Sequence, residues 1–155
     1  MKYEDLLIEA SNNNIYVIEN ANFDSKATGL INGDVIGLNQ SIKTSDEKAC
    51  VLAEELGHYY TSVGNILDDK TVENRKQEQR ARLWAYNKQV GLRGIIDCHN
   101  AHCHTIHEMS EFLEVTEQFL TEALECYKHK YGVYTTVDNY IVGFEPYLYV
   151  IEKFQ

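Results

Sequence analysis

The most regular hydrophobic pattern in the chain predicts a long helix over residues 45–63. Thr44 followed three residues later by Glu47 forms a capping box, in which each side chain bonds the backbone N–H of the other residue. Gly64-Asn65 marks the predicted end of this helix. The apolar residues that recur on one of its faces are Leu52, Leu56, Tyr59 and Val63.

Four further segments have apolar residues at helical spacing. The run Asn12-Asn13-Asn14 stops the first of them, and Gly132 closes the last. The last two are joined around Glu114-Val115 and resemble a helix-turn-helix. The predicted helices cover residues 3–10, 72–90, 106–113 and 116–131.

Strand-like patterns fall near the two ends of the chain. Residues 15–18 form an apolar, β-branched run, and residues 28–38 predict two strands joined at Asn32-Gly33, a dipeptide that favours a tight hairpin turn. These three strands are expected to form a small antiparallel sheet. The tail, residues 137–154, is rich in Tyr, Val and Ile and predicts one or two strands broken at Pro146. The expected fold class is therefore α+β.

Length and charge exclude several classes of protein. The chain has 155 residues, enough for one compact domain with a helical appendage but not for a second independent enzyme domain. With 24 acidic and 14 basic side chains the formal net charge is −10, which disfavours direct binding of nucleic acid. Since no apolar run of signal or membrane length occurs, we expect a cytoplasmic protein with free thiols and no membrane partner.

Residues with the chemistry of a metal site lie on the predicted helix 45–63. Glu54 and His58 are four residues apart, so both side chains project from one face of the helix. Glu55 lies about 60° around the helix from His58, close enough to reach a metal-bound water as a general base. Taken alone, this spacing more often marks only the solvated face of an amphipathic helix.

The next predicted helix offers a third ligand. Glu78 shares a face with Ala81 and Ala85, so small residues allow this helix to approach while one carboxylate points at the first helix. We therefore predict one divalent metal held by Glu54, His58 and Glu78, with Glu55 as the catalytic residue.

Together these motifs resemble the ImmA/IrrE family of metallopeptidases. The resemblance spans residues 28–85 and rests on the hairpin, the capped helix with Leu52-Ala53-Glu54-Glu55-Leu56-Gly57-His58, and the later Glu78-x-x-Ala81-x-x-x-Ala85. It implies a zincin-like metallopeptidase core, a small sheet plus a metal-binding helix pair, followed by a helical, helix-turn-helix-like region. It also implies a protein substrate: a helix-turn-helix repressor that silences a phage, a mobile element or stress genes.

One residue departs from the family pattern, because Glu54 stands where the family has the first His of its His-Glu-x-x-His motif. Two carboxylates and one imidazole form a harder donor set than a two-His site. Zinc remains the expected metal, with manganese and iron more competitive than in the two-His site. The expected domains are a metallopeptidase domain, 1–91, and a C-terminal region with a strand-like tail, 92–155, packed on the same core.

Two other features of the sequence have the chemistry of a site. Tyr59 and Tyr60 could supply an oxyanion donor, but Tyr59 falls on the apolar face of the helix, so core packing is the better expectation. A dense stretch of cysteine and histidine lacks any paired structural-zinc spacing, so we expect a loop or helix start without a physiological metal. Its members are Cys98, His99, His102, Cys103, His104 and His107.

Three functions remain open at this point. The first is a metallo-endopeptidase that cleaves a repressor, and the second is a non-hydrolytic antirepressor that binds the same protein. The third is a DNA-binding regulator that uses residues 109–131. Acidic residues along the second helix of that segment argue against phosphate contacts and favour a protein-binding helical pair.

Overall fold

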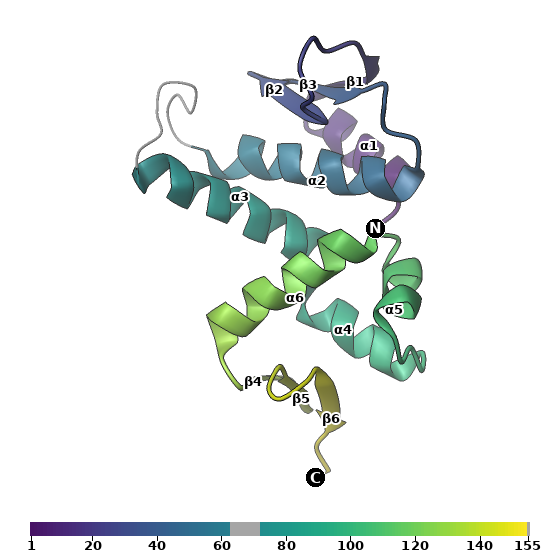
Figure 1. Cartoon of the computed structure of the whole chain (residues 1–155), viewed down its shortest axis with the longest axis vertical. Coiled ribbons are helices and arrows are strands. Elements are labelled where there is room, and N and C mark those ends of the chain that lie inside the picture. Colours follow the sequence, from purple (N-terminus) through teal and green to yellow (C-terminus); the bar gives the residue numbers. More distant parts are fainter. Residues whose placement is uncertain (63–71, 155) are drawn as a thin grey trace. The chain divides into compact units, whose positions relative to one another are not determined.

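The computed structural model describes residues 1–62 and 72–154 and divides into two units, residues 1–88 and 89–155. The first contains α1 (Tyr3–Asn12), β1 (Tyr16–Ala21), β2 (Gly29–Asn32), β3 (Val35–Asn39), α2 (Ser45–Thr61) and nearly all of α3 (Val72–Gln89). The second contains α4 (Gly91–Asn100), α5 (Ile106–Leu113), α6 (Glu117–Tyr131), β4 (Tyr134–Val137), β5 (Tyr140–Gly143) and β6 (Tyr149–Glu152) (Figure 1). The expected division into domains stays a prediction.

The sheet of the first unit has the strand order β1-β3-β2 and is mixed. β2 and β3 form the predicted antiparallel hairpin, but β1 pairs with β3 in parallel, so the expectation of an antiparallel sheet is wrong for this strand. The reason is the connection over residues 22–28, which carries the chain past β3 to the opposite edge of the sheet. β2 is thereby left as an edge strand.

The hairpin turn lies one residue later than predicted. Asn32 pairs with Val35, so the two turn residues are Gly33 and Asp34. Gly33 has φ +63°, and a positive φ at the first turn residue alone is the pattern of a type II′ turn.

The core of the first unit lies between this sheet and helices α1 and α2. α2 packs against α1, β2 and β3, and α1 packs against β1. α2 begins where predicted and ends at Thr61; the stop signal Gly64-Asn65 lies outside the described residues. The side chains with no solvent exposure in this core include Leu6, Ile36, Leu38, Leu52 and Leu56.

In the second unit, α5 and α6 match the predicted helical pair closely. Glu114 follows α5 in the left-handed region with φ +58°, and the Thr116 side chain accepts a hydrogen bond from the backbone N–H of Phe119 at 3.1 Å. Gly132 ends α6 with φ +75°, as expected. The tight connection between the two predicted helices therefore forms from ordinary caps on both of them.

The rest of the second unit differs from the expectation. No helix was predicted over residues 91–100, where the structure has α4, a helix that buries Ile95, Ile96 and Cys98. The cysteine–histidine stretch, expected to be a loop or helix start, covers the end of α4, the loop after it and the start of α5. The tail forms three antiparallel strands in the order β4-β5-β6, where one or two were predicted. The missed strand precedes a tight turn at Asp138, whose φ is +52°. Pro146 lies between β5 and β6, so the predicted break is present.

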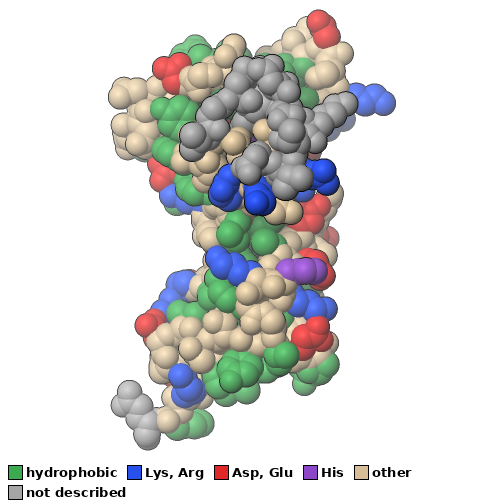
Figure 2. All heavy atoms as spheres, turned by 90° about the vertical axis from the view of Figure 1, so that its left-hand side faces the viewer, with side chains coloured by type: hydrophobic (Ala, Val, Ile, Leu, Met, Phe, Trp, Pro, Cys, Tyr) green, Lys and Arg blue, Asp and Glu red, His purple; other side chains and the backbone are tan. Residues whose placement is uncertain are grey.

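Two properties concern the described chain as a whole. Among the described residues, no helix is long and apolar enough to span a membrane. Although the net charge is −10, the face shown in Figure 2 carries Lys and Arg side chains interspersed with Asp and Glu. This face therefore does not present charge of one sign only.

Candidate metal centre

The candidate centre is built on α2, whose N-terminus is fixed by its predicted cap. The Thr44 hydroxyl accepts a hydrogen bond from the backbone N–H of Glu47 at 3.1 Å, which satisfies one of the free donors at the helix start. Leu52 and Leu56 are fully buried against the sheet and α1. This anchoring sets the rotation of the helix, and with it the direction in which Glu55 and His58 project.

α3 approaches α2 closely at Gly57. A Cβ atom at this position would lie 2.3 Å from the carbonyl oxygen of Ala81, a distance that no side chain could tolerate without moving the helix. Ala81 and Ala85 are fully buried, in accordance with the prediction that small residues allow the approach. Gly57 was missed in the sequence, although an isolated glycine inside a helical pattern is a known sign of close packing.

This approach brings His58 and Glu78 together. Nε2 of His58 lies 3.5 Å from Oε2 of Glu78. Two ligand atoms on one tetrahedral metal, each about 2.1 Å from the ion, are about 3.4 Å apart, so the pair has the separation of two metal ligands. Nδ1 of His58 is buried and has no hydrogen-bond partner among the described residues, so the ring lacks the carboxylate or carbonyl that commonly orients a metal-bound histidine.

Glu55 lies beneath the edge strand β2. A Cβ atom at Gly29 would meet the Glu55 side chain at 3.0 Å and Cγ1 of Val51 at 2.7 Å, so the carboxyl group occupies the space that this glycine leaves open. Burial, together with the negative charges of Glu54 and Glu78, raises the pKa of the Glu55 carboxyl from 4.5 to about 7. Gly29 was also missed; a glycine inside a predicted strand is the signal that points to such a contact.

The role of Glu54 as a ligand stays a prediction. Its charge acts on Glu55, and within residues 1–62 and 72–154 no three His, Cys, Asp or Glu side chains form a group that could hold a metal ion. The structure brings two of the three predicted ligands, His58 and Glu78, into contact, and the predicted base Glu55 lies within the influence of the Glu78 charge.

A comparison with protein families identifies the family of the chain. The model of the IrrE N-terminal-like domain, a peptidase family, matches residues 9–125, well over half of the chain. The chain belongs to this family. Neither a curated protein nor a solved structure matches it. The resemblance found in the sequence is confirmed, and the match is longer than residues 28–85, because it continues through α4 and α5 into α6.

As a member of the IrrE N-terminal-like family, the chain has the fold of a metallopeptidase, which implies a divalent metal and a protein substrate. The residues present fit such a metal in part. The separation of His58 and Glu78 and the hard oxygen donors suit a divalent ion, whereas Glu54 supplies an oxygen where the family motif has a nitrogen.

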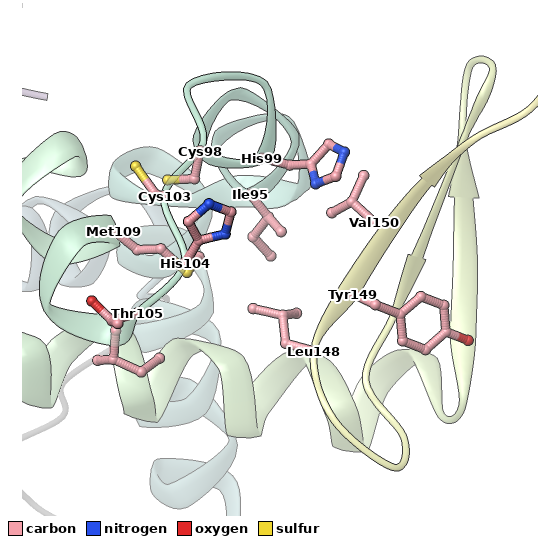
Figure 3. Close-up of a pocket in the computed structure, with 11 residues that line it drawn as sticks. Ile95, Cys98, His99, Cys103, His104, Thr105, Met109, Leu148, Tyr149 and Val150 are labelled. Carbon is pink, nitrogen blue, oxygen red and sulfur yellow. The ribbon is translucent and has the colours of Figure 1, made fainter.

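The structure also places the side chains of two other features of the sequence. Core packing was the better expectation for Tyr59, and it is wrong, because this side chain is 38% exposed at the end of α2, next to Tyr60 at 40%. In the second unit, Cys98, Cys103 and His104 line a pocket of about 270 Å³ (Figure 3). Among the described residues no three His, Cys, Asp or Glu side chains form a group that could hold a metal ion, and the expectation that this stretch binds no physiological metal stays a prediction.

Proposed function

We propose that the chain is a metal-dependent endopeptidase in which Glu54, His58 and Glu78 hold one divalent metal and Glu55 is the general base. The observation that carries this proposal is the 3.5 Å approach of His58 to Glu78 from two different helices, next to a buried carboxyl group. Zinc is the first choice of metal, and manganese or iron are alternatives for a site with two carboxylates.

Glu55 is suited to proton transfer at neutral pH. A carboxyl group with a pKa of about 7 exchanges its proton readily near that pH, so Glu55 would accept a proton from the attacking water and deliver it to the leaving amine. The bound metal would supply polarisation of the scissile carbonyl and acidify the water. Because Glu55 lies directly under Gly29, the substrate would pass along β2.

β2 is also suited to holding an extended substrate. Among the described strands it pairs with β3 alone and lies at the edge of its sheet, and its Leu30 side chain is 50% exposed. An unpaired strand edge binds an extended segment through main-chain hydrogen bonds. We infer that the substrate is a helix-turn-helix repressor of a phage or mobile element, cleaved in the cytoplasm in a locally unfolded or loop segment.

A second function, non-hydrolytic antirepression, is favoured by one specific feature. Glu54 replaces the first histidine of the family motif, and the described residues contain no group of three metal-binding side chains. A chain that had lost catalysis through this replacement would still bind the repressor through the same surface. Binding without cleavage would then relieve repression.

The test compares the unmodified full-length chain with Glu55→Gln. A glutamine can still hydrogen-bond the water but cannot accept its proton, so cleavage of a helix-turn-helix repressor should fall by about a hundredfold or more. Repressor binding should stay within about twofold, since no other contact changes. Glu122→Gln, which alters an exposed carboxylate on α6, is the matched control and should cleave normally.

The same pair of proteins separates the two functions. If the unmodified chain, supplied with zinc, manganese or iron, cuts the repressor and Glu55→Gln does not, the peptidase is supported. Equal relief of repression by both proteins, with no cleavage by either, would support the antirepressor instead.

A further inference from the structure

Three helices of the chain end in the same backbone motif. In each, one residue at the helix end has a positive φ (Asn14, His102 and Glu114), and two hydrogen bonds return to the last turn, as in the Schellman motif. This motif places the side chain of its first residue against that of its sixth. The pairs so brought together are Ala10 and Ile15 after α1, Ser110 and Val115 after α5, and Cys98 and Cys103 after α4.

At the end of α4 the motif holds two thiols together. The backbone N–H of Cys103 donates to the carbonyl of Cys98 at 2.9 Å, and that of His102 donates to the carbonyl of His99 at 3.0 Å. His102 has φ +62°, which turns the chain back over the helix end. At the end of α1 this motif brings together two apolar side chains, Ala10 and Ile15, whereas at the end of α4 it brings together two thiols.

The two sulfur atoms interact directly and differ in exposure. Cys98 and Cys103 share a side-chain hydrogen bond, and Figure 3 shows their sulfur atoms next to each other. Cys98 is 1% exposed, whereas Cys103 is partly exposed at the wall of the pocket of about 270 Å³. A small oxidant therefore reaches Cys103 first.

We propose that Cys98 and Cys103 form a reversible disulfide, with Cys103 as the thiol that reacts first and Cys98 as the thiol that resolves it. A disulfide needs Cα atoms about 4.4–6.8 Å apart, and the backbone hydrogen bond between these two residues keeps their main chains adjacent. Both residues lie in one helix end, so the bond closes without movement of one unit against the other.

The oxidant proposed is a hydroperoxide, and its reaction balances in two steps. The Cys103 thiolate attacks one peroxide oxygen, the O–O bond breaks, and Cys103 becomes a sulfenic acid while water is released after protonation. The Cys98 sulfur then attacks the Cys103 sulfur, the S–O bond breaks, and a second water leaves with the thiol proton. Two thiols have been oxidised and one peroxide reduced to two waters.

The order of the two thiols follows from their surroundings. Burial raises the pKa of the Cys98 thiol to about 12, with the neighbouring Cys103 acting in the same direction, so Cys98 stays protonated at neutral pH. A protonated, buried thiol is a poor first nucleophile. It is, however, in contact with the sulfur that has been activated, which is what a resolving cysteine requires.

The first experiment treats the full-length, chelator-washed chain with hydrogen peroxide, alkylates the remaining thiols and maps the disulfide. A protease that cuts after glutamate releases residues 79–108, a fragment with Cys98 and Cys103 but not Cys126. The expected result is the loss of two hydrogen atoms from this fragment, without alkylation, fully reversed by dithiothreitol. Sulfinic acid at Cys103, or a disulfide that includes Cys50 or Cys126, would overturn the proposal.

A second experiment uses oxidised glutathione and does not depend on peroxide. In the unmodified chain the mixed disulfide at Cys103 should be displaced by Cys98, so no adduct should accumulate; in Cys98→Ala the adduct should persist. Cys126→Ala is the control and should behave as the unmodified chain. If Cys98→Ala fails to fold, Cys103→Ser gives the answer, because it should yield neither disulfide nor adduct in residues 79–108. A stable adduct in the unmodified chain would contradict the resolving role.

Discussion

The candidate metal centre of the first unit and the cysteine–histidine stretch of the second differ in how the sequence brings side chains together. His58 and Glu78 are twenty positions apart, yet their side chains meet at 3.5 Å because two helices approach closely. The second stretch has six metal-ligand residues within ten positions, and the contact described there, between Cys98 and Cys103, comes from a local turn. In neither region of the described chain do three metal-binding side chains form a group, so density along the chain brings no more ligands together than the approach of two helices does.

The largest expected effect tests the close approach itself. In Gly57→Ala, the new Cβ would meet a backbone oxygen of α3 at 2.3 Å, so one helix must move. We expect a loss of about 3 kcal/mol in the free energy of unfolding and loss of metal retention. Urea denaturation measures the change in stability, and elemental analysis measures the metal that the chain retains.

A matched glycine in the second unit serves as the control. A Cβ at Gly94 in α4 would meet only a Leu113 methyl group, at 3.2 Å, so Gly94→Ala should change stability by no more than about 1 kcal/mol. Equal effects of the two substitutions would show that α2 and α3 are not in the tight contact described.

The next effect concerns the buried carboxyl group of the metal-free chain. The pKa of Glu55 rises from 4.5 to about 7 on folding, so between these pH values the unfolded state loses its proton before the folded state does. Stability should therefore fall as pH rises from 4.5 to 7, by about 3 kcal/mol in total, and stay level above that. Glu55→Gln should remove this fall and be the more stable protein at pH 7.5.

Denaturation midpoints of the chelated protein and of Glu55→Gln, measured at several pH values, show how the stability of each depends on pH. Glu122→Gln should keep the pH dependence of the unmodified chain, because Glu122 is exposed. A Glu55→Gln protein whose stability still fell between pH 5 and 7 would show that another group is responsible.

A smaller effect is expected when the family motif is restored. In Glu54→His an imidazole replaces a carboxylate in a mixed site, so zinc should bind about tenfold more tightly. Competition with a chromogenic chelator measures the affinity. No gain, in a variant that folds normally, would mean that Glu54 is not a ligand.

The smallest effect belongs to the second unit. His102 adopts φ +62° at the position after the α4 cap, where glycine carries no steric penalty. His102→Gly should raise the free energy of unfolding by about 1 kcal/mol. Ala101→Gly, at a residue with φ −87°, should instead lower it. Thermal unfolding of both variants at one pH measures these two opposite changes in stability.

Much of the first unit could be predicted because its signals are local. The cap at Thr44 and the apolar face of α2 fixed one helix, and Ala81 and Ala85 correctly indicated a close neighbour. The parallel pairing of β1 with β3 could not be predicted, because it depends on which side of β3 the connection passes. Strand order is a tertiary property that neither strand encodes alone.

The missed parts of the second unit have a similar cause. α4 contains Gly91 and Gly94, which lower helix propensity, and it is held instead by the burial of Ile95 and Ile96. The contact of Cys98 with Cys103 needed the turn at His102, a residue that seldom adopts a positive φ. At the metal centre, the roles of Gly29 and Gly57 became clear only from the atoms that a Cβ would meet.

The most direct test of the central claim is the zinc content of the reloaded full-length chain. One zinc per chain is expected, with losses in His58→Ala and Glu78→Gln, because these side chains are the pair that the two helices bring together. A variant with Cys98, His102, Cys103 and His107 replaced together should retain the metal. If that variant lost the zinc, while His58→Ala and Glu78→Gln kept it, the metal would lie in the second unit and the proposed centre would be wrong.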